Sequence, residues 1–222
     1  MNSSFDWCKY NADRNKEAAK INKFNLNSNF NYSEKGIYNH IRDIYALSLI
    51  ISKDKKKTKV LDYGGGLISQ SNLINKISLK NYHFTIYNPY IKKIKKNFLF
   101  NYSITDNHNH LNKKKFDLIY FGSCLQYVRN EKILTKLNFI EKSKFILITH
   151  TPLSFGAKIF VNEKQKNQKN LSQKIYTYDF IKKKLLKNKF TLIFKSINDF
   201  NYSGLKMNKK NIKSMNLLFK KN

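Results

Sequence analysis

The glycine-rich segment from Val60 to Gly66 contains the residues best suited to binding a ligand. An apolar run ends there at the acid Asp62, and the glycines Gly64, Gly65 and Gly66 follow. Glycines let the backbone pass close to a ligand, and a helix that starts after them points its free amide groups at that ligand. A carboxylate before the glycines repels a pyrophosphate but suits a cationic ligand that carries an amino acid. The segment therefore favours a cationic cofactor over a dinucleotide.

Polar side chains that could act on a substrate follow two other predicted strands. His150 ends the predicted fifth strand, and Gln126 and Tyr127 follow the fourth. Ligands of open α/β folds bind at the carboxyl ends of the strands, so these three are the candidate catalytic residues. His150 is the best candidate base, because its charge state can change near neutral pH. A loop histidine that makes a structural hydrogen bond fits the sequence about equally well.

The elements that must position these residues alternate along the chain. Apolar runs predict strands near residues 59–63, 82–87, 98–104, 116–121, 144–149 and 190–196, with a last run near 212–219. Longer amphipathic runs predict helices near residues 69–79, 90–97, 130–140 and 178–188. This alternation predicts an α/β fold with a mostly parallel sheet and helices on both faces. The segments 190–196 and 213–220 have no helix between them and can pair antiparallel.

The ends of this pattern suggest one globular domain with an extension. With 222 residues, 41% of them hydrophobic, the chain can bury one core. We expect residues 1–52 to form an N-terminal helical cap, with an amphipathic helix over 34–52, and residues 53–222 to form the main domain. The polar stretch 153–172, rich in Lys, Asn and Gln, predicts a long loop or a mobile lid close to His150.

The formal charge of +29 raises nucleic acid or an anionic membrane surface as partners. Nearly all of the positive charge is lysine, however, because arginine occurs only at positions 14, 42 and 129. The lysine runs are spread along the chain rather than collected on one element. We therefore interpret the charge as compositional, and nucleic acid as a partner that the sequence allows but does not favour.

Several classes of protein do not fit the sequence. No apolar run approaches the roughly 20 residues of a membrane span, and the polar N-terminus lacks the apolar core of a secretory signal. Cys8 and Cys124 are too far apart in sequence for a CxxC motif, and Cys124 fits a small buried thiol. His108 and His110 lie in a predicted polar loop, and the histidines show no metal-ligand spacing, so we expect no metal site. These features predict a cytoplasmic protein.

Several segments resemble class I S-adenosylmethionine (SAM)-dependent methyltransferases. The pattern Asp-x-Gly-x-Gly that starts at Asp62 resembles their motif I. Further segments are similar to one bacterial methyltransferase family often associated with surface-polysaccharide genes: Val60 to Gly66, Phe116 to Val128, Ile146 to Pro152 and Gln173 to Phe180, with Trp7, Ala12 and the Arg42-Asp43 pair. Ser-x-Leu-Gln-Tyr, from Ser123 to Tyr127, is the most specific of these. The resemblance implies a Rossmann-like seven-stranded methyltransferase sheet with an antiparallel C-terminal strand, and SAM as cofactor.

The resemblance also implies which residues bind the cofactor. They are Asp62, Gly64, Gly65, Gly66, Asn88 and Ser123. Asn88 ends the second strand, where such enzymes usually place an acid for the ribose hydroxyls, and Ile68 stands where the family tends to have another glycine. An amide bonds a diol more weakly than a carboxylate does.

We therefore expect O- or N-methylation of a small or carbohydrate-derived acceptor. Methyl transfer from a sulfonium needs proximity and, for a hydroxyl acceptor, a base, so no catalytic dyad is required. One alternative is an RNA methyltransferase, which lysines converging around the glycine loop would favour. Another is a binding protein that kept the fold and lost the chemistry, which Ile68 and Asn88 favour. The sequence gives neither the acceptor, the methylated atom, the pathway nor the oligomeric state.

Overall fold

The computed structural model describes residues 57–65, 81–89, 102–128, 134, 138–163, 171–198 and 211–222. The predicted cap at residues 1–52, the predicted helices near 69–79 and 90–97, and the residues Gly66 and Ile68 lie outside this part of the chain.

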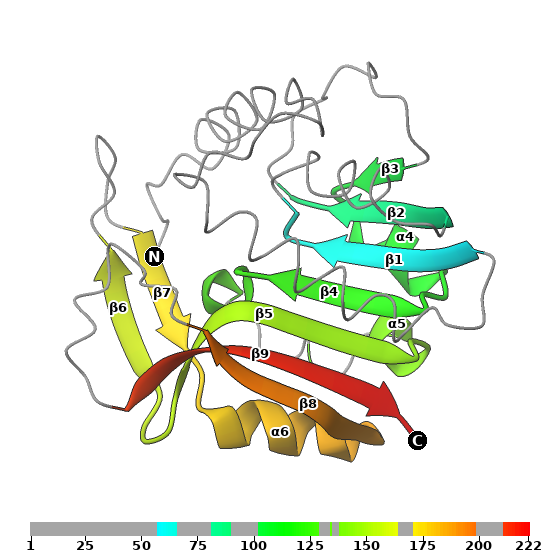
Figure 1. Cartoon of the computed structure of the whole chain (residues 1–222). Coiled ribbons are helices and arrows are strands. Elements are labelled where there is room, and N and C mark those ends of the chain that lie inside the picture. The colour runs from blue at the N-terminus through cyan, green and yellow to red at the C-terminus, as the bar shows by residue number, and fades with distance from the viewer. Residues whose placement is uncertain are drawn as a thin grey trace, which may run out of the picture.

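A seven-stranded sheet forms the centre of the described chain (Figure 1). Its strands are β1 (Lys57–Tyr63), β2 (Asn81–Tyr87), β3 (Tyr102–Thr105), β4 (Leu118–Gly122), β5 (Phe145–Ser154), β8 (Phe190–Asn198) and β9 (Ile212–Lys221). They lie in the order β3-β2-β1-β4-β5-β9-β8. All pairs are parallel except those of β9, which runs antiparallel to both β5 and β8. The predicted sheet, with its antiparallel C-terminal strand, is confirmed.

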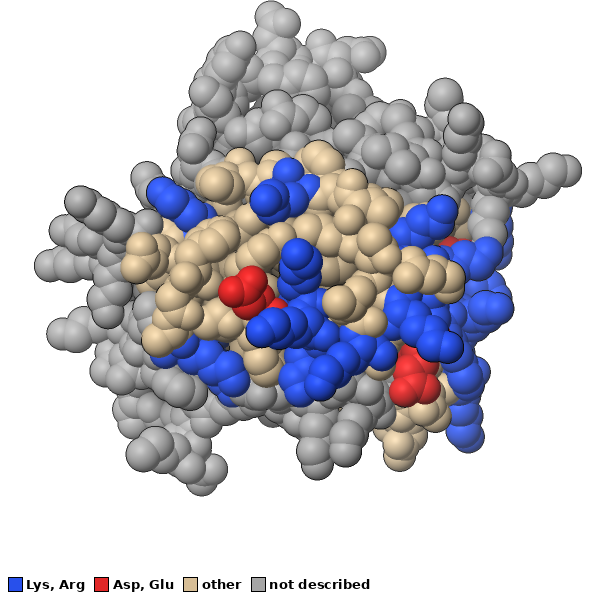
Figure 2. Space-filling model, turned by 90° about the horizontal axis from the view of Figure 1, so that it is seen from below, with Lys and Arg blue, Asp and Glu red and all other residues tan. Residues whose placement is uncertain are grey.

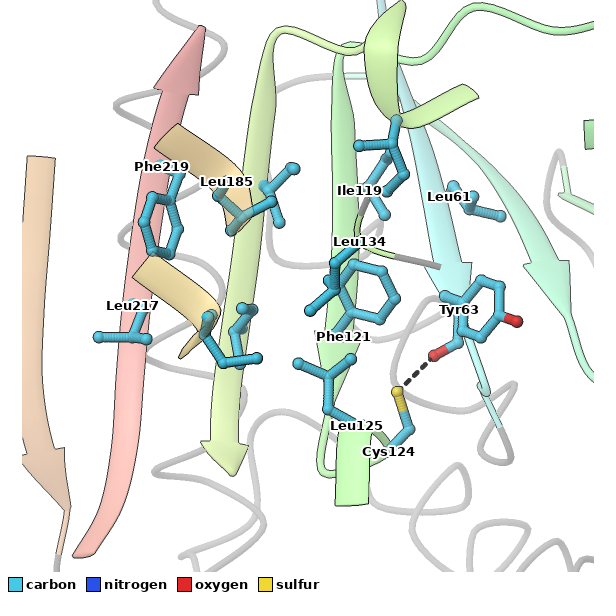
Figure 3. Close-up of a cluster of buried hydrophobic side chains, with 14 of the residues drawn as sticks. Leu61, Tyr63, Ile119, Phe121, Cys124, Leu125, Leu134, Leu185, Leu217 and Phe219 are labelled. Carbon is cyan, nitrogen blue, oxygen red and sulfur yellow. Dashed lines mark hydrogen bonds between the residues drawn. The ribbon is translucent and has the colours of Figure 1, made fainter. Parts of the chain in front are cut away.

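Apolar side chains on the two faces of the sheet enter two separate clusters, as the period of two in a strand requires. Leu61, Ile119 and Leu217 belong to the larger cluster, whereas Val60 and Leu118 belong to the smaller one on the other face. Figure 3 shows part of the larger cluster, with side chains from β1, β4 and β9 and with Leu185 from a helix that packs on this face. The sheet is therefore covered by buried apolar contacts on both sides.

The described helices pack on the face of the larger cluster. They are α4 (His108–Asn112), α5 (Asn138–Glu141) and α6 (Tyr178–Lys187). α6 begins where the Thr177 side chain accepts a hydrogen bond from the Phe180 amide at 3.1 Å, and it buries Ile181 and Leu185. The predicted helices over 34–52, 69–79 and 90–97 lie outside the described residues.

Two sequence predictions are wrong in detail. The stretch 153–172 is not a structureless loop, because β5 continues to Ser154 and a hairpin follows it, with β6 (Ile159–Glu163) antiparallel to β7 (Leu171–Ile175). Residues 164–170 at its tip lie outside the described chain. The segment around His108 and His110 forms the short helix α4 rather than a polar loop. No helix of the described chain is long and apolar enough to cross a membrane.

Candidate functional site

The carboxyl ends of the parallel strands meet at one edge of the sheet. β1 has β2 on one side and β4 on the other, so the strand order reverses between β1 and β4. Such a reversal opens a crevice at the carboxyl ends, where ligands of open α/β sheets bind. The loop after β1 contains Gly64 and Gly65, and the loop after β4 contains Ser123 and Gln126. The chain therefore brings the predicted site residues that the structure describes to the expected edge.

The close packing of the loop after β1 explains its glycines. Gly64 has φ +76°, a left-handed conformation that favours glycine, and a Cβ there would lie 2.8 Å from Cβ of Cys124. A Cβ on Gly65 would lie 2.5 Å from a carboxylate oxygen of Asp62. The Gly64 amide donates to the Tyr87 carbonyl at 2.8 Å, which ties the loop to β2. Both glycines thus leave room for Asp62 and Cys124 against the loop.

Asp62 is a buried carboxyl group at this edge, with 4% of its surface exposed. Burial raises its pKa from 3.8 to about 7, because desolvation disfavours the charged form. A nearby cation would reverse this cost by favouring the carboxylate. A buried carboxyl group in this state, beside the glycines, is suited to a cationic ligand.

Asn88 supports the glycine loop directly. Its side-chain amide donates to the Gly65 carbonyl at 3.2 Å, and its backbone amide donates to the Thr105 carbonyl at 3.1 Å. The side chain is buried, with 5% exposed. Asn88 thus holds the loop after β1 against the ends of β2 and β3, a role that the sequence does not reveal.

The loop after β4 is joined to the loop after β1 through Cys124. Its thiol donates to the Tyr63 carbonyl at 2.9 Å (Figure 3). Burial raises the pKa of the thiol well above its usual value, and the neighbouring Asp62 adds to the shift. Cys124 is therefore an unreactive packing residue, which confirms the prediction of a small buried thiol.

Ser123 lies between the ends of β4 and β5. It has φ 52°, an uncommon conformation for a residue with a side chain. Its amide donates to the Thr149 carbonyl at 3.0 Å, and its hydroxyl donates to the His150 carbonyl at 3.1 Å. These bonds link the candidate cofactor loop to the candidate base.

Gln126 and Tyr127 belong to the short 3-10 helix η2 (Leu125–Tyr127) that follows. Gln126 is 1% exposed, and its Nε2 donates to the Ser123 carbonyl at 2.9 Å. Its Oε1 is buried and has no hydrogen-bond partner among the residues that the structure describes. An amide oxygen in that state is suited to accept a hydrogen bond from a ligand. Tyr127 is half-buried, and its amide donates to the Cys124 carbonyl at 3.0 Å.

His150 lies at a β-bulge in β5. The register with β9 shifts between Ile148 and Thr151, and His150 has φ 47°. Its amide donates to Oδ1 of Asn216 at 3.0 Å, and Nδ2 of Asn216 donates to the Ser196 hydroxyl at 3.2 Å. Bulges often redirect a side chain next to a binding site, and here the conformation is held by a partner from β9.

The hairpin of β6 and β7 packs over this region. β7 contacts both η2 and β5. The Tyr176 hydroxyl donates to the Val128 carbonyl at 2.6 Å, and the Ser154 amide donates to the Tyr176 carbonyl at 2.9 Å. Gln173 on β7 is fully buried, and so is Ile175 on the same side of the strand. The buried face of the hairpin thus brings a second amide side chain to the part of the fold that contains Gln126.

Two residues of this region escaped the sequence analysis. Asn216 interrupts the apolar run from Met215 to Phe219, and an amide inside a buried strand is the signal that could have revealed it. Gln173 directly follows the predicted loop at 153–172, and the sequence analysis names it only as the first residue of a segment that resembles the methyltransferase family.

The histidines near β3 make structural contacts. His108 Nε2 lies 2.7 Å from the Tyr63 hydroxyl, and its ring stacks on Tyr87 with centroids 4.4 Å apart. Burial lowers the pKa of His108. Within the described ranges, no group of three His, Cys, Asp or Glu side chains gathers as a metal site would require.

Solved structures with the same architecture include methyltransferases. Magnesium protoporphyrin IX methyltransferase from Synechocystis PCC 6803, with bound S-adenosylhomocysteine (SAH), matches 97% of this chain and 96% of its own at 11% identity, with a TM-score of 0.59. The N-terminal domain of EvdMO1, in the presence of SAH and D-fucose, matches 100% of both chains at 10% identity, with a TM-score of 0.55. The 1,6-didemethyltoxoflavin-N1-methyltransferase of Burkholderia thailandensis, with bound 1,6-didemethyltoxoflavin and SAH, matches 100% of this chain and 93% of its own at 9% identity, with a TM-score of 0.54.

The chain has the class I methyltransferase fold. No family model matches its sequence, and no curated protein does. The structural neighbours act on different kinds of molecule, so the fold leaves the acceptor open.

Proposed function

We propose that this protein is a SAM-dependent methyltransferase that methylates an oxygen or nitrogen of a small or carbohydrate-derived acceptor. The observation that carries the proposal is the buried Asp62 carboxyl beside Gly65 at the carboxyl edge of the sheet, with its pKa raised to about 7 by burial alone. A site that favours a cation suits the ammonium and sulfonium groups of SAM. A cytoplasmic location is part of the proposal.

The residues proposed to hold SAM are Asp62, Gly64, Gly65, Asn88 and Ser123. Gly66 belongs to the same motif. Asp62 contributes negative charge, and the glycines let the backbone approach the cofactor. Asn88 orders the loop through its bond to the Gly65 carbonyl. When bound, SAM supplies a methyl group that its sulfonium sulfur already activates.

The acceptor is proposed to bind between η2 and the hairpin. Gln126 on η2, Gln173 on β7 and His150 on β5 are buried side chains of three elements that contact one another, and all can hydrogen-bond a neutral polar molecule. Neutral amides and an imidazole suit hydroxyl or amide groups better than they suit phosphates. His150 is proposed to take the proton of a hydroxyl acceptor, with Gln126 and Tyr127 orienting that acceptor.

Two further observations support a carbohydrate-derived acceptor. The domain of EvdMO1 with the same fold was crystallised in the presence of SAH and D-fucose. Segments of this sequence also resemble a family often associated with surface-polysaccharide genes. An RNA acceptor is less well supported, because lysines of the described chain gather at the opposite edge of the sheet, at residues such as Lys113, Lys142 and Lys220.

The cofactor proposal is tested by calorimetric titration of the full chain with SAM and with SAH. We expect one molecule of either ligand to bind per chain. In Gly65→Ala the new methyl group meets the Asp62 carboxylate, so the affinity for SAM and the affinity for SAH should each fall by at least about tenfold. Gly156→Ala is the matched control, because no atom lies within 3.8 Å of a Cβ there. No binding by the parent, or equal binding by both variants, contradicts the proposal.

The acceptor site is tested separately, with a carbohydrate acceptor found by screening for methyl transfer. Gln126→Leu should raise the acceptor KM, and His150→Ala should lower kcat, each by about tenfold or more, while SAH affinity stays within about twofold. Parental kinetics in both variants would remove this end of the sheet from the acceptor site. Binding of SAM without transfer to any acceptor would favour the inactive binding protein instead.

A further inference from the structure

Lysine side chains converge on the edge of the sheet opposite the candidate site. The parallel strands begin at this edge, and β9 ends there because it runs the other way. Lysines lie just before β4, just before β5 and at the end of β9. Six of these lysines are exposed, and we call them the amino-edge patch: Lys113, Lys114, Lys115, Lys142, Lys144 and Lys220. In Figure 2 blue side chains gather at the right, the side where β1 and β5 begin in Figure 1.

The topology holds these lysines side by side although they are distant in the sequence. The Phe145 amide donates to the Asp117 carbonyl at 3.0 Å, which joins the starts of β4 and β5. The Lys221 amide donates to the Lys144 carbonyl at 2.8 Å, which joins the end of β9 to the same place. The fold therefore concentrates charge that looks dispersed in the sequence.

Little negative charge offsets the amino-edge patch within the described residues. The Asp117 carboxylate accepts a hydrogen bond from the Lys59 amide at 3.0 Å, and Glu141 is exposed next to Lys142. The described part of this edge therefore presents a strong positive potential.

The chemistry of the patch favours a lipid surface over a nucleic acid. No arginine falls within the described residues, so the described part of this edge offers only lysine ammonium groups and no bidentate fork of the kind that recognises phosphates in nucleic acids. The rings of Phe116 and Phe190 at this edge are buried and cannot stack on bases. Leu186, which is 58% exposed, lies near the end of α6, close to the start of β8 at the same edge. Lysines on the same edge as an exposed aliphatic side chain suit anionic headgroups over an acyl layer.

We propose that the amino-edge patch docks the protein on the surface of a bilayer that contains anionic lipid. In that orientation the carboxyl edge, with Asp62 and Ser123, faces away from the bilayer. The candidate cofactor site then stays open to the aqueous phase. The proposal does not depend on the proposed activity, because it uses a different edge of the sheet.

The test is sedimentation of the full chain with vesicles. Vesicles of phosphatidylcholine with about 30% phosphatidylglycerol should bind the protein, and binding should fall steeply above about 100 mM NaCl. Pure phosphatidylcholine vesicles should not bind it. The triple variant Lys142→Glu, Lys144→Glu, Lys220→Glu should bind at least about tenfold more weakly. A matched control carries Lys182→Glu, Lys183→Glu and Lys213→Glu. These substitutions change the net charge by the same amount as the patch variant, at exposed positions outside the patch. The control should lose less than about threefold in affinity for the anionic vesicles.

Circular dichroism establishes that each variant is folded. If the first triple variant is unfolded, a second triple variant with Lys113→Gln, Lys114→Gln and Lys115→Gln tests the same patch. We expect this variant to lose less vesicle affinity, because each substitution removes one charge rather than two. The proposal is overturned if the parent does not bind anionic vesicles, or if the patch and control variants lose binding equally. It is also overturned if poly(U) RNA binds the patch at physiological salt and displaces the vesicles, because the partner is then a nucleic acid.

Discussion

At the residue scale, Asn88 shows how a role inferred from position changes once contacts are known. A carboxylate at this position suits ribose hydroxyls, so the sequence alone suggests that Asn88→Asp tightens cofactor binding by about 1 kcal/mol. The structure shows the Asn88 amide donating to the Gly65 carbonyl. A carboxylate cannot donate there, and two oxygens would face each other.

We therefore expect Asn88→Asp to weaken SAH binding rather than strengthen it. The loss of a buried hydrogen bond and the new repulsion should lower the free energy of unfolding by about 1 to 3 kcal/mol. Urea unfolding and SAH titration of the variant measure both effects. Tighter SAH binding in Asn88→Asp, with unchanged stability, would show that the ribose contact outweighs the bond to Gly65.

Asp62 makes stability depend on pH. Its folded pKa of about 7 is above the unfolded value of 3.8, so the folded state holds the proton more tightly. The resulting stabilisation is fully present below about pH 4 and is lost as pH rises to about 7. The free energy of unfolding of the parent, relative to Asp62→Asn, should fall by a few kcal/mol across this range. Urea unfolding at several pH values measures this difference, and a difference that stays constant would mean that Asp62 ionises normally.

At the element scale, the bulge in β5 is held by a residue far away in sequence. The His150 amide bonds to Asn216 across 66 residues. Asn216→Leu keeps the volume similar but leaves the buried His150 amide without its acceptor, so the free energy of unfolding should fall by about 1 to 3 kcal/mol. Ser196→Ala removes only the hydrogen bond from Asn216 to the Ser196 hydroxyl, so it should lower the free energy of unfolding by less than about 1 kcal/mol. Equal losses in urea unfolding would mean that the bulge does not depend on Asn216.

Periodic elements could be predicted from the sequence, and long-range details could not. β1, β2 and α6 follow from apolar periodicity, and the β8–β9 pair follows from two apolar runs with no predicted helix between them. The β6–β7 hairpin was missed, because its Lys, Asn and Gln residues lack a clean alternation. The carboxyl-edge location of Asp62, Gln126 and His150 follows from the strand ends. The left-handed conformations of Ser123 and His150 do not, because they depend on packing between separate strands.

At the scale of the whole molecule, charge and ligand chemistry lie at opposite edges of one sheet. The formal charge of +29 repels itself, and the amino-edge patch concentrates part of it. Screening by salt should therefore raise the Tm by several degrees between about 50 and 500 mM NaCl. The variant Lys142→Glu, Lys144→Glu, Lys220→Glu should show a smaller rise. A Tm that does not respond to NaCl would mean that the lysines are too far apart to repel strongly.

The central claim is that Asp62 faces a cationic cofactor, and proton release on SAH binding tests it most directly. With its pKa at about 7, Asp62 is about half protonated at pH 7 in the free protein, and a bound ammonium group should ionise it. Calorimetric titration with SAH in two buffers of different ionisation enthalpy should therefore give about half a proton released per ligand. Asp62→Asn should release none. Absence of SAH binding, or binding with the same proton count in parent and variant, would contradict the account.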